Sequence, residues 1–392
     1  MRITHICLLA PVTDGWSYQD NLLSKYHRKA GHDVTIITSM WVWGTDGKLI
    51  RDERSNYTNE NDVRVVRLEM YGKDSFSRKF KRFHDLYLSI EETEPDILFI
   101  HGVSFRDTGV IAKYLSSHPN VVAYADNHAD YSNSGTNWIS KNILHKIIWK
   151  HYARKLFPYV RKFYGVLPAR VGFLTDCYGV PSEKCELLVM GADDELVEET
   201  KRLNKREKVR RAYEVSDDDF LIATGGKINK YRPEVLNLIK AVININERMS
   251  NVKLLFFGTA TEDYKKEFDH LCAHPCIINV GWVKSDETYD YIEAADLVVF
   301  PGLHSVTWEQ AVAQGKPCMF RDISGFDHVD VGGNALFLRD VSVDGIRTSL
   351  KTIIENRELY TRMKSVAEEK GATVFSYKDI ARRSIDSRDN IS

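Results

Sequence analysis

Short apolar segments alternate with helical patterns along both halves of the chain, and this alternation restricts the fold more than any other feature of the sequence. In the first half we predict helices over residues 17–30 and 76–94, and strands over residues 3–9, 33–38, 63–68, 96–101 and 121–124. In the second half we predict a helix over residues 233–248, and strands over residues 220–224, 252–257, 277–280, 296–300 and 318–320. Strands that are separated by helices of about 10–15 residues pair in parallel. The predicted fold class is therefore α/β, with two parallel-sheet domains.

The length of 392 residues exceeds one ordinary hydrophobic core, which predicts two domains. A charged stretch between residues 193 and 211 sets the boundary near residue 195, so the domains are predicted over residues 1–195 and 196–375. The net charge of −1 gives no information about binding partners, so only local clusters of charge can indicate them. The six cysteines lack the paired spacing of a zinc site, which favours the reduced thiols of a cytoplasmic protein. No apolar run reaches the roughly 20 residues that a membrane span needs.

The most informative segment of the second half, residues 296–320, joins a buried strand to a short helix. His304 lies in the loop after the strand, and Ser305 is expected to cap the helix. The free N–H groups at a helix N-terminus suit a diphosphate, and Glu309 lies where a carboxylate can accept hydrogen bonds from a ribose diol. The alternative is that Ser305 only caps the helix and Glu309 only complements its dipole.

A second segment of the same half combines two glycines with three cations. Gly225 and Gly226 end a predicted strand, and Lys227, Lys230 and Arg232 follow within a few residues. This combination favours a phosphate-binding loop, although a solvated basic turn before the next helix would read the same way. The segment is neither a P-loop nor a dinucleotide-binding fingerprint, which argues against a kinase or a dehydrogenase.

In their order along the chain, these segments resemble the donor domain of retaining GT-B glycosyltransferases of family 4 (glycosyl transferases group 1). The order is Gly-Gly-Lys, a strand ending in Phe-Phe-Gly, a Gly-Trp-Val turn, and a strand–Pro–helix segment followed by Gly-Lys-Pro. Residues 31–38, 94–102 and 189–193 also look like landmarks of that family. The resemblance implies two Rossmann-like domains facing a central cleft, and a C-terminal helix within residues 376–392 that crosses back to the first domain.

The resemblance also implies roles for individual residues. Lys227 and Arg232 match the cations that hold the donor diphosphate, Glu309 matches the Glu on the ribose, and His128 matches the N-domain His beside the donor sugar. The remaining donor-binding residues are expected in the glycine segment, the base-reading turn and the helix start: Gly225, Gly226, Gly281, Trp282, Val283, Ser305, Val306 and Thr307. One position departs from the family, because Pro301 stands where the first Glu of its E-x7-E motif normally faces the sugar. His304 occupies that region and is predicted, with His128, to be catalytic.

Polar residues directly after the strand over residues 121–124 form a candidate acceptor site. They include Asp126, Asp130 and Asn133, and Gly15 and Trp16 occupy the first strand–helix loop. Ligands bind α/β proteins at the carboxyl ends of parallel strands, where both loops are expected. A turn rich in Asx and Ser residues would look similar.

Residues 131–175 contain eight lysines and arginines and no carboxylate, with aromatic residues among them. Two rows follow helical spacing, the first being Ile139, Ile143 and Ile147, and the second Leu144, Ile148 and Tyr152. A basic amphipathic helix with aromatic residues suits an anionic membrane surface, and residues 76–83 repeat that character. Nucleic acid is an alternative partner, but no nucleic-acid-binding module is recognised.

These observations together predict a retaining, metal-independent glycosyltransferase, which acts in bacterial cell-surface polysaccharide synthesis on a glycan or lipid-linked acceptor. A nucleoside-diphosphate sugar is the expected co-substrate, and no other cofactor is expected. The expected location is the cytoplasm, peripherally on the inner face of the cell membrane. Two alternatives stay open: a GT-B sugar-nucleotide epimerase, and a non-catalytic nucleotide-sugar-binding assembly protein, which the missing first Glu would suit.

Overall fold

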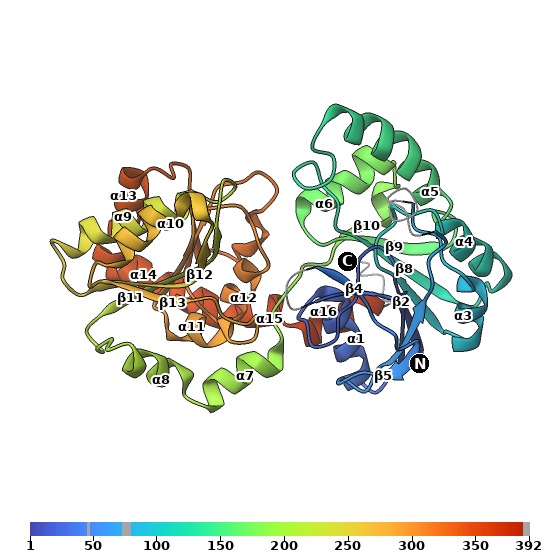
Figure 1. The fold of residues 1–392 in the computed structure, drawn as a ribbon, viewed down its shortest axis with the longest axis horizontal. Coiled ribbons are helices and arrows are strands. Elements are labelled where there is room, and N and C mark those ends of the chain that lie inside the picture. The colour runs from blue at the N-terminus through green and yellow to red at the C-terminus, as the bar shows by residue number, and fades with distance from the viewer. Residues whose placement is uncertain (45–47, 73–79, 387–392) are drawn as a thin grey trace. The chain divides into compact units, whose positions relative to one another are not determined.

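The computed structural model describes residues 1–44, 48–72 and 80–386, which form two compact units. Unit 1 contains Met1–Met190 together with the chain from Ile380 onward, and unit 2 contains Gly191–Asp379. Each unit is built on a mainly parallel sheet with helices around it (Figure 1), so the predicted α/β class is confirmed. Within the described residues, every helix is too short or too polar to span a bilayer.

The sheet of unit 1 has eight strands among the residues described. In spatial order they are β10 (Cys185–Leu187), β9 (Val160–Gly165), β8 (Val122–Asn127), β7 (Ile97–Ile100), β1 (Arg2–Cys7), β2 (Asp33–Ser39), β6 (Arg64–Leu68) and β5 (Asn56–Thr58). Neighbouring strands pair in parallel except β5 and β6, and a separate antiparallel pair consists of β3 (Trp41–Trp43) and β4 (Leu49–Arg51). The strand order reverses between β1 and β7, which is where open α/β sheets bind ligands.

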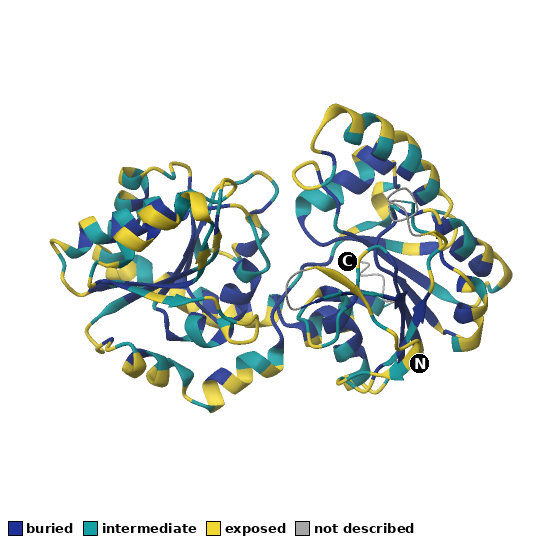
Figure 2. Ribbon diagram, in the orientation of Figure 1, coloured by how far each residue is buried: buried dark blue, intermediate teal, exposed yellow. Residues whose placement is uncertain are grey.

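Helices cover both faces of the unit 1 sheet, and strands such as β7 are therefore completely buried. They are α1 (Gln19–Lys29), α3 (Leu86–Thr93), α4 (Thr108–Ser117), the π-helical η1 (Ser140–Trp149), α5 (Lys150–Arg154), α6 (Pro168–Phe173), η2 (Leu174–Tyr178) and the 3₁₀ turn η3 (Ser182–Lys184). Figure 2 shows the buried residues concentrated in the strands and on the inner faces of these helices. The helix predicted over residues 76–94 lies partly outside the described residues, which contain α3.

The sheet of unit 2 has six parallel strands in the described chain. In spatial order they are β13 (Ile277–Gly281), β12 (Val252–Ala260), β11 (Phe220–Ile228), β14 (Leu297–Phe300), β15 (Cys318–Arg321) and β16 (Ala335–Leu338). Numbered within the unit, this order is 3-2-1-4-5-6, the doubly wound order of Rossmann domains. The strand order reverses between β11 and β14, the two strands that lead into the predicted donor segments.

The helices of unit 2 follow the strands in turn. They are α7 (Asp194–Arg202), α8 (Lys205–Ala212), α9 (Glu234–Asn246), α10 (Glu262–Cys272), α11 (Thr288–Ala294), α12 (Thr307–Ala313), η4 (Asp327–Val329), α13 (Val343–Glu355), α14 (Arg357–Val366), η5 (Ala367–Gly371), α15 (Ala372–Val374) and α16 (Tyr377–Ile385). Helix α16 begins in unit 2 and ends in unit 1. Helix α16 lies within residues 376–392, where a C-terminal helix was predicted.

The Gly-Gly-Lys segment is strand and not loop, which corrects the prediction. Strand β11 continues through Lys227 to Ile228 and stays paired with β12, Gly226 lying opposite Gly258. The glycines make this close pairing possible, because a Cβ on Gly225 would lie 2.0 Å from the Phe257 ring. A Cβ on Gly258 would likewise lie 2.0 Å from the Gly226 carbonyl oxygen. The loop that follows the strand therefore begins only at Asn229.

Candidate functional site

The loops after β11 and β14 meet at the carboxyl edge of the unit 2 sheet, and Arg232 joins them. Its Nη2 donates a hydrogen bond to the backbone carbonyl of His304, at 3.2 Å. Its stem lies against Gly302, where an added Cβ would be 3.4 Å from Arg232 Cγ, and its Nη1 would be 3.4 Å from a Cβ on Gly226. The structure thus brings Gly226 and Arg232 next to His304, which is 72 residues beyond Arg232 in sequence.

The guanidinium of Arg232 is partly withdrawn from water. Burial lowers the pKa of Arg232, although nearby Glu234 acts in the opposite direction. Glu234 itself is paired with Arg321, at 2.5 Å, and its Oε2 has no hydrogen-bond partner among the described residues. Lys227, by contrast, is exposed at the end of β11. The edge therefore presents one anchored cation and one freely accessible cation.

Behind this edge, a buried carboxylate is held by two histidines. Glu309 Oε1 lies 2.8 Å from His304 Nε2 and 2.8 Å from His328 Nε2, and the Glu309 side chain has no exposed surface. Its Oε2 is also buried and has no hydrogen-bond partner in the part of the chain that is described. Burial acts to raise the pKa of Glu309, but the two histidines outweigh it and hold this pKa at about 2. Glu309 is therefore an ionised member of a histidine–carboxylate cluster.

This geometry corrects two predictions for the helix start. Glu309 offers no exposed oxygen to a ribose, so the predicted direct contact is not supported. Ser305 is not the cap of α12, because the helix begins after Val306, which has helical φ and ψ angles and makes no side-chain cap. The Ser305 hydroxyl instead lies 2.5 Å from the hydroxyl of Thr307. Helix α12 has only seven residues, too few for a strong dipole.

The remaining predicted donor residues lie at the far side of the sheet. Gly281 ends β13 with φ +84°, and the Trp282 indole beyond it is 72% exposed. Val283 is partly buried. Because β13 is two strands away from β11, this turn is separate from the edge around Arg232, and its assignment to a nucleotide base stays a prediction.

In unit 1, Asp126 ends β8 and is completely buried, which corrects its assignment to the acceptor. Its Oδ1 accepts the backbone N–H of Gly102 at 2.8 Å, and its Oδ2 lies 2.9 Å from His101 Nδ1. His128 lies beside this carboxylate, with Nε2 3.5 Å from Asp126 Oδ2, and 36% of its side chain is exposed. His128 is therefore the most accessible member of this group, and its catalytic role stays a prediction.

Asp130 and Asn133 hold the turn that carries His128. Asp130 is buried and pairs with Arg170 at 3.0 Å, which corrects its assignment to the acceptor. Asn133 donates from Nδ2 to the carbonyl of His128 at 2.8 Å, so it supports the backbone there. Gly15 has φ +74° and donates its N–H to Glu60, and the Trp16 ring packs on Tyr18. The acceptor roles of Gly15, Trp16 and Asn133 stay predictions.

Two trios of side chains have ligand atoms close enough for a metal ion. They are His304, Glu309 and His328, and Cys7, Asp20 and His101, with the ligand atoms of each trio within 4.8 Å of one another. In the first trio, the Nε2 atoms of both imidazoles face the same oxygen of Glu309. This is the arrangement expected of two N–H groups that donate to one carboxylate oxygen. In the second, burial raises the pKa of the Cys7 thiol to about 12, so it is not the thiolate that metals prefer. The prediction that no metal is needed stays a prediction.

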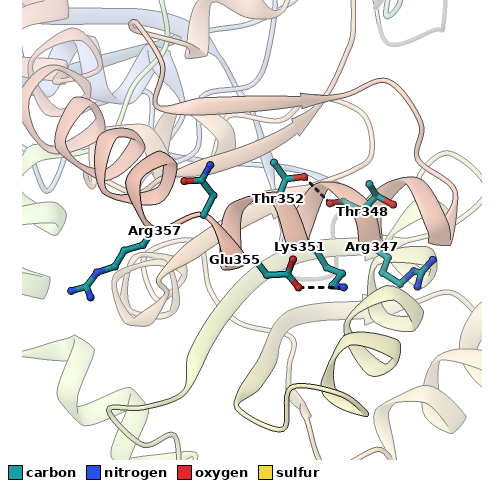
Figure 3. A pocket seen from close by; sticks show the side chains of 7 residues that line it. Arg347, Thr348, Lys351, Thr352, Glu355 and Arg357 are labelled. Atoms are coloured by element: carbon teal, nitrogen blue, oxygen red, sulfur yellow. Dashed lines mark hydrogen bonds and ion pairs between the residues drawn. The ribbon is translucent and has the colours of Figure 1, made fainter.

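A hollow on the surface of unit 2 is separate from these residues. It is lined by Arg347, Thr348, Lys351, Thr352, Glu355, Asn356 and Arg357, from α13 and the start of α14 (Figure 3). Its charged side chains are partly paired with one another, since Lys351 lies 3.2 Å from Glu355. None of the predicted site residues lines it.

His328 and His101 are the site residues that sequence reasoning missed. His328 lies in a loop after β15, and His101 directly follows β7. His101 lies within residues 94–102, one of the family landmarks, and at the carboxyl end of a buried strand, so the sequence did carry a signal for it. His328 belongs to no motif, and its partner Glu309 is 19 residues away.

Both halves of the chain match known glycosyltransferase families. Residues 21–196 match the family described as Glycosyltransferase Family 4, and residues 218–356 match the family described as Glycosyl transferases group 1. A search of curated proteins finds no match.

Solved structures of low sequence identity share the fold over almost the whole chain. Anabaena Alr3699/HepE in complex with UDP is 14% identical, with 98% of each chain covered and a TM-score of 0.68. WaaG, described as a glycosyltransferase involved in lipopolysaccharide biosynthesis, is 12% identical, with 98% of this chain and 99% of its own covered and a TM-score of 0.65. The same values hold for UDP-GlcNAc 2-epimerase from Neisseria meningitidis bound to UDP-GlcNAc. The family matches, one over each half of the chain, together with this shared fold identify the chain as a glycosyltransferase of the GT-B fold.

Proposed function

We propose that this glycosyltransferase takes its sugar from a nucleoside-diphosphate donor, whose phosphates bind unit 2 at the edge where Arg232 joins two loops. The observation that carries the proposal is the presence at this edge of an anchored cation, Arg232, and an accessible one, Lys227. Cations at this edge would offset the charge that develops on the departing diphosphate, which is the task of a metal in other transferases. UDP is the first nucleotide to test, because similar structures are described with UDP or a UDP-sugar.

We further propose transfer with retention of the anomeric configuration and without a metal ion, as the family resemblance implies. His128 is the residue of unit 1 that we assign to the reacting sugar, because it is exposed and its Nε2 faces an ionised carboxylate. The test of metal independence is turnover after exhaustive chelation. Loss of activity that added Mg²⁺ or Mn²⁺ restores would overturn that part of the proposal.

The acceptor is proposed to be lipid-linked, in cell-surface polysaccharide synthesis on the inner face of the membrane. Support comes from η1 and the residues next to it, where the two apolar rows predicted from the sequence face opposite sides. Leu144, Ile148 and Tyr152 pack against the core of unit 1. The opposite row is open to solvent, with exposures between 40% and 70% at Trp138, Ile139, Ile143 and Ile147. Lysines and arginines flank this row and line a hollow beside it, namely Lys146, Lys150, Arg154 and Lys155.

The experiment is a thermal-shift screen of UDP-, GDP-, ADP- and CMP-sugars, followed by a transfer assay with the sugar nucleotide that binds. A ligand that binds only the folded state at 100 times its Kd stabilises it by about 2.7 kcal/mol, which is measurable. Absence of a shift with every sugar nucleotide would overturn the donor assignment.

An epimerase is the second candidate, because UDP-GlcNAc 2-epimerases share the fold and Pro301 removes the acidic residue expected near the sugar. Incubation with each sugar nucleotide alone separates the two functions. An epimerase interconverts the sugar with no acceptor present, whereas a transferase produces new linkages only when an acceptor is added. Binding without either reaction would favour a non-catalytic assembly protein.

A further inference from the structure

Three buried histidines form a continuous row at the point in unit 1 where the strand order reverses. His27 comes from α1, His5 from β1, and His101 directly follows β7. His27 Nδ1 lies 3.0 Å from His5 Nε2, and His5 Nδ1 lies 2.9 Å from His101 Nε2. All three side chains are almost completely buried, so water does not complete their hydrogen bonds.

Each end of this histidine row meets a group of known hydrogen-bonding character. At one end, His27 Nε2 lies 2.9 Å from the backbone carbonyl of Ala381 and 3.0 Å from the Ser384 hydroxyl, both on α16. At the other end, His101 Nδ1 lies 2.9 Å from a carboxylate oxygen of Asp126 and 2.9 Å from one of Asp20. A carbonyl and an ionised carboxylate can only accept.

These ends fix the direction of every hydrogen bond between them. The Ala381 carbonyl requires a proton on His27 Nε2, so the neutral His27 ring accepts at Nδ1. His5 must then donate from Nε2 and accept at Nδ1, and His101 must donate from Nε2. Because His101 Nδ1 also faces two carboxylates, it needs a second proton there. With Asp126 ionised, this geometry requires a cationic His101 and two neutral histidines behind it.

The electrostatics of the row agree with this arrangement. Burial lowers the pKa of His5 well below its ordinary value and that of His27 to about 4, so both are neutral at pH 7. Burial acts in the same direction on His101, but Cys7, Asp20 and Asp126 together raise its pKa well above the ordinary value.

The other groups that face His101 leave this arrangement intact. They are the Cys7 thiol and the His5 ring from β1, the Asp20 carboxylate from α1, and the Asp126 carboxylate from β8. Burial raises the pKa of Asp126, but His101 and then His128 reverse this and hold it well below its ordinary range. Asp126 is thus ionised and paired.

We infer that His27, His5 and His101 form a hydrogen-bond chain of fixed direction, anchored on α16, that keeps His101 as a buried cation and so positions Asp126 and His128. An ionised Asp126 orients the His128 imidazole electrostatically, with Nε2 turned toward the carboxylate at 3.5 Å from Oδ2. His101 is in this view a positioning residue. The claim about the histidine charges stands by itself, and only its consequence for His128 rests on the proposed function.

The test uses the full-length protein with ¹⁵N-labelled histidine, and NMR to count and locate the ring protons at pH 8. His101 is expected to carry two ring protons, and His5 and His27 one each, on Nε2. A neutral His101 in the parent protein, or a His5 proton on Nδ1, would overturn the inference.

Two variants of His27 distinguish the effect of hydrogen-bond direction from the effect of packing a ring at this position. His27→Gln retains an amide donor for Ala381 and a carbonyl acceptor for His5, so His101 should keep both protons. His27→Phe retains the ring but frees His5 to donate from Nδ1, so His101 should lose one proton. His32→Gln is the matched control, because this ring lies beside His27 but outside the row. Equal proton counts in the Gln and Phe variants would also overturn the inference.

If His27→Phe does not fold, the parent and His27→Gln spectra still decide the proton positions. Where the protein transfers sugar, His27→Phe should lower kcat and leave the Kd for UDP unchanged, while His27→Gln restores kcat. If the ring protons lie where we expect them but the protein transfers no sugar, the proposed function is refuted. The hydrogen-bond chain of His27, His5 and His101 would still hold.

Discussion

Glu309 carries its charge inside unit 2, where two imidazole groups replace water as its partners. Its pKa falls from 4.5 in the unfolded chain to about 2 in the folded protein. A depressed folded pKa contributes stability that is fully present above the unfolded value. That contribution is lost progressively as the pH falls from about 4.5 to about 2.

The first prediction concerns this carboxylate. Glu309→Ala should lower the free energy of unfolding at pH 7 by about 3–5 kcal/mol, because it leaves two buried imidazoles without their acceptor. The deficit relative to the parent should shrink at pH 3, where the parent has lost part of the contribution. Urea unfolding at both pH values measures this, and Glu247→Ala, an exposed carboxylate of the same unit, is the control. An equal deficit at both pH values would contradict the assignment of the charge to Glu309.

The second prediction concerns the two cations of the donor edge. Lys227→Ala should weaken UDP binding by roughly 1.5–3 kcal/mol, the cost of a lost charge-assisted hydrogen bond, without changing the melting temperature. Arg232→Ala should weaken binding and also lower the melting temperature, because Arg232 holds the His304 loop. Calorimetric titration with UDP measures the affinities. Lys230→Ala, which removes a nearby exposed cation, should bind UDP as the parent does.

The residues of the edge were found from sequence because Lys227, Arg232, His304 and Glu309 lie close to two strand ends. The contacts among these residues could not be predicted from the sequence, because they depend on which loops the order of the strands brings together. His328 reaches Glu309 from a loop 19 residues further along the chain, and no local pattern reports that meeting. Burial then changed the expected role of Glu309 from ligand contact to internal charge.

At the scale of elements, η1 shows one helix with two apolar rows of different use. Its inner row packs against the core, while its outer row of isoleucines faces solvent among cations. The sequence spacing predicted both rows but could not assign a side to either, because each repeats every four residues.

The third prediction tests these two sides. Ile143→Ser combined with Ile147→Ser should reduce sedimentation with phosphatidylglycerol vesicles and leave the melting temperature unchanged. Leu144→Ala should do the reverse, because Leu144 is half-buried against the core; the cost should stay below the roughly 2–5 kcal/mol of a fully buried leucine. Binding by the parent should weaken in high salt, because part of the attraction is between cations and anionic lipid. If the double serine variant sediments with vesicles as the parent does, and if salt does not change this binding, the proposed membrane location is wrong.

Strands were predicted well where an apolar run is continuous, as in β7 and β14. The missed strands have a physical reason. Strand β9 carries Arg161 and Lys162 on exposed or half-buried positions, which breaks the apolar run. Strand β16 has only four residues at the edge of its sheet. Strand β11 is longer than predicted because its glycines permit close pairing with β12 instead of ending the strand.

At the scale of the whole molecule, the two units have separate cores and candidate sites of different chemistry. The fourth prediction is that saturating UDP slows amide exchange within unit 2, at residues 225–232 and 301–309. Ligand binding to the folded state suppresses local opening of the segments that it contacts. Hydrogen exchange followed by mass spectrometry measures this, with Lys227→Ala as the variant in which protection should diminish. Protection confined to unit 1 would move the nucleotide site.

The return of the chain to unit 1 at Ile380 has a consequence for biosynthesis. A ribosome adds every residue of unit 2 before it adds Ala381, whose carbonyl accepts the hydrogen bond from His27. A nascent chain at that stage holds a complete second unit, while the first lacks its closing helix. Unit 1 therefore cannot reach its final structure until the residues from Ile380 onward have been made, although translation begins with unit 1. A premature stop codon after position 379 would leave the sequence of unit 2 complete and deprive unit 1 of the Ala381 carbonyl that accepts from His27.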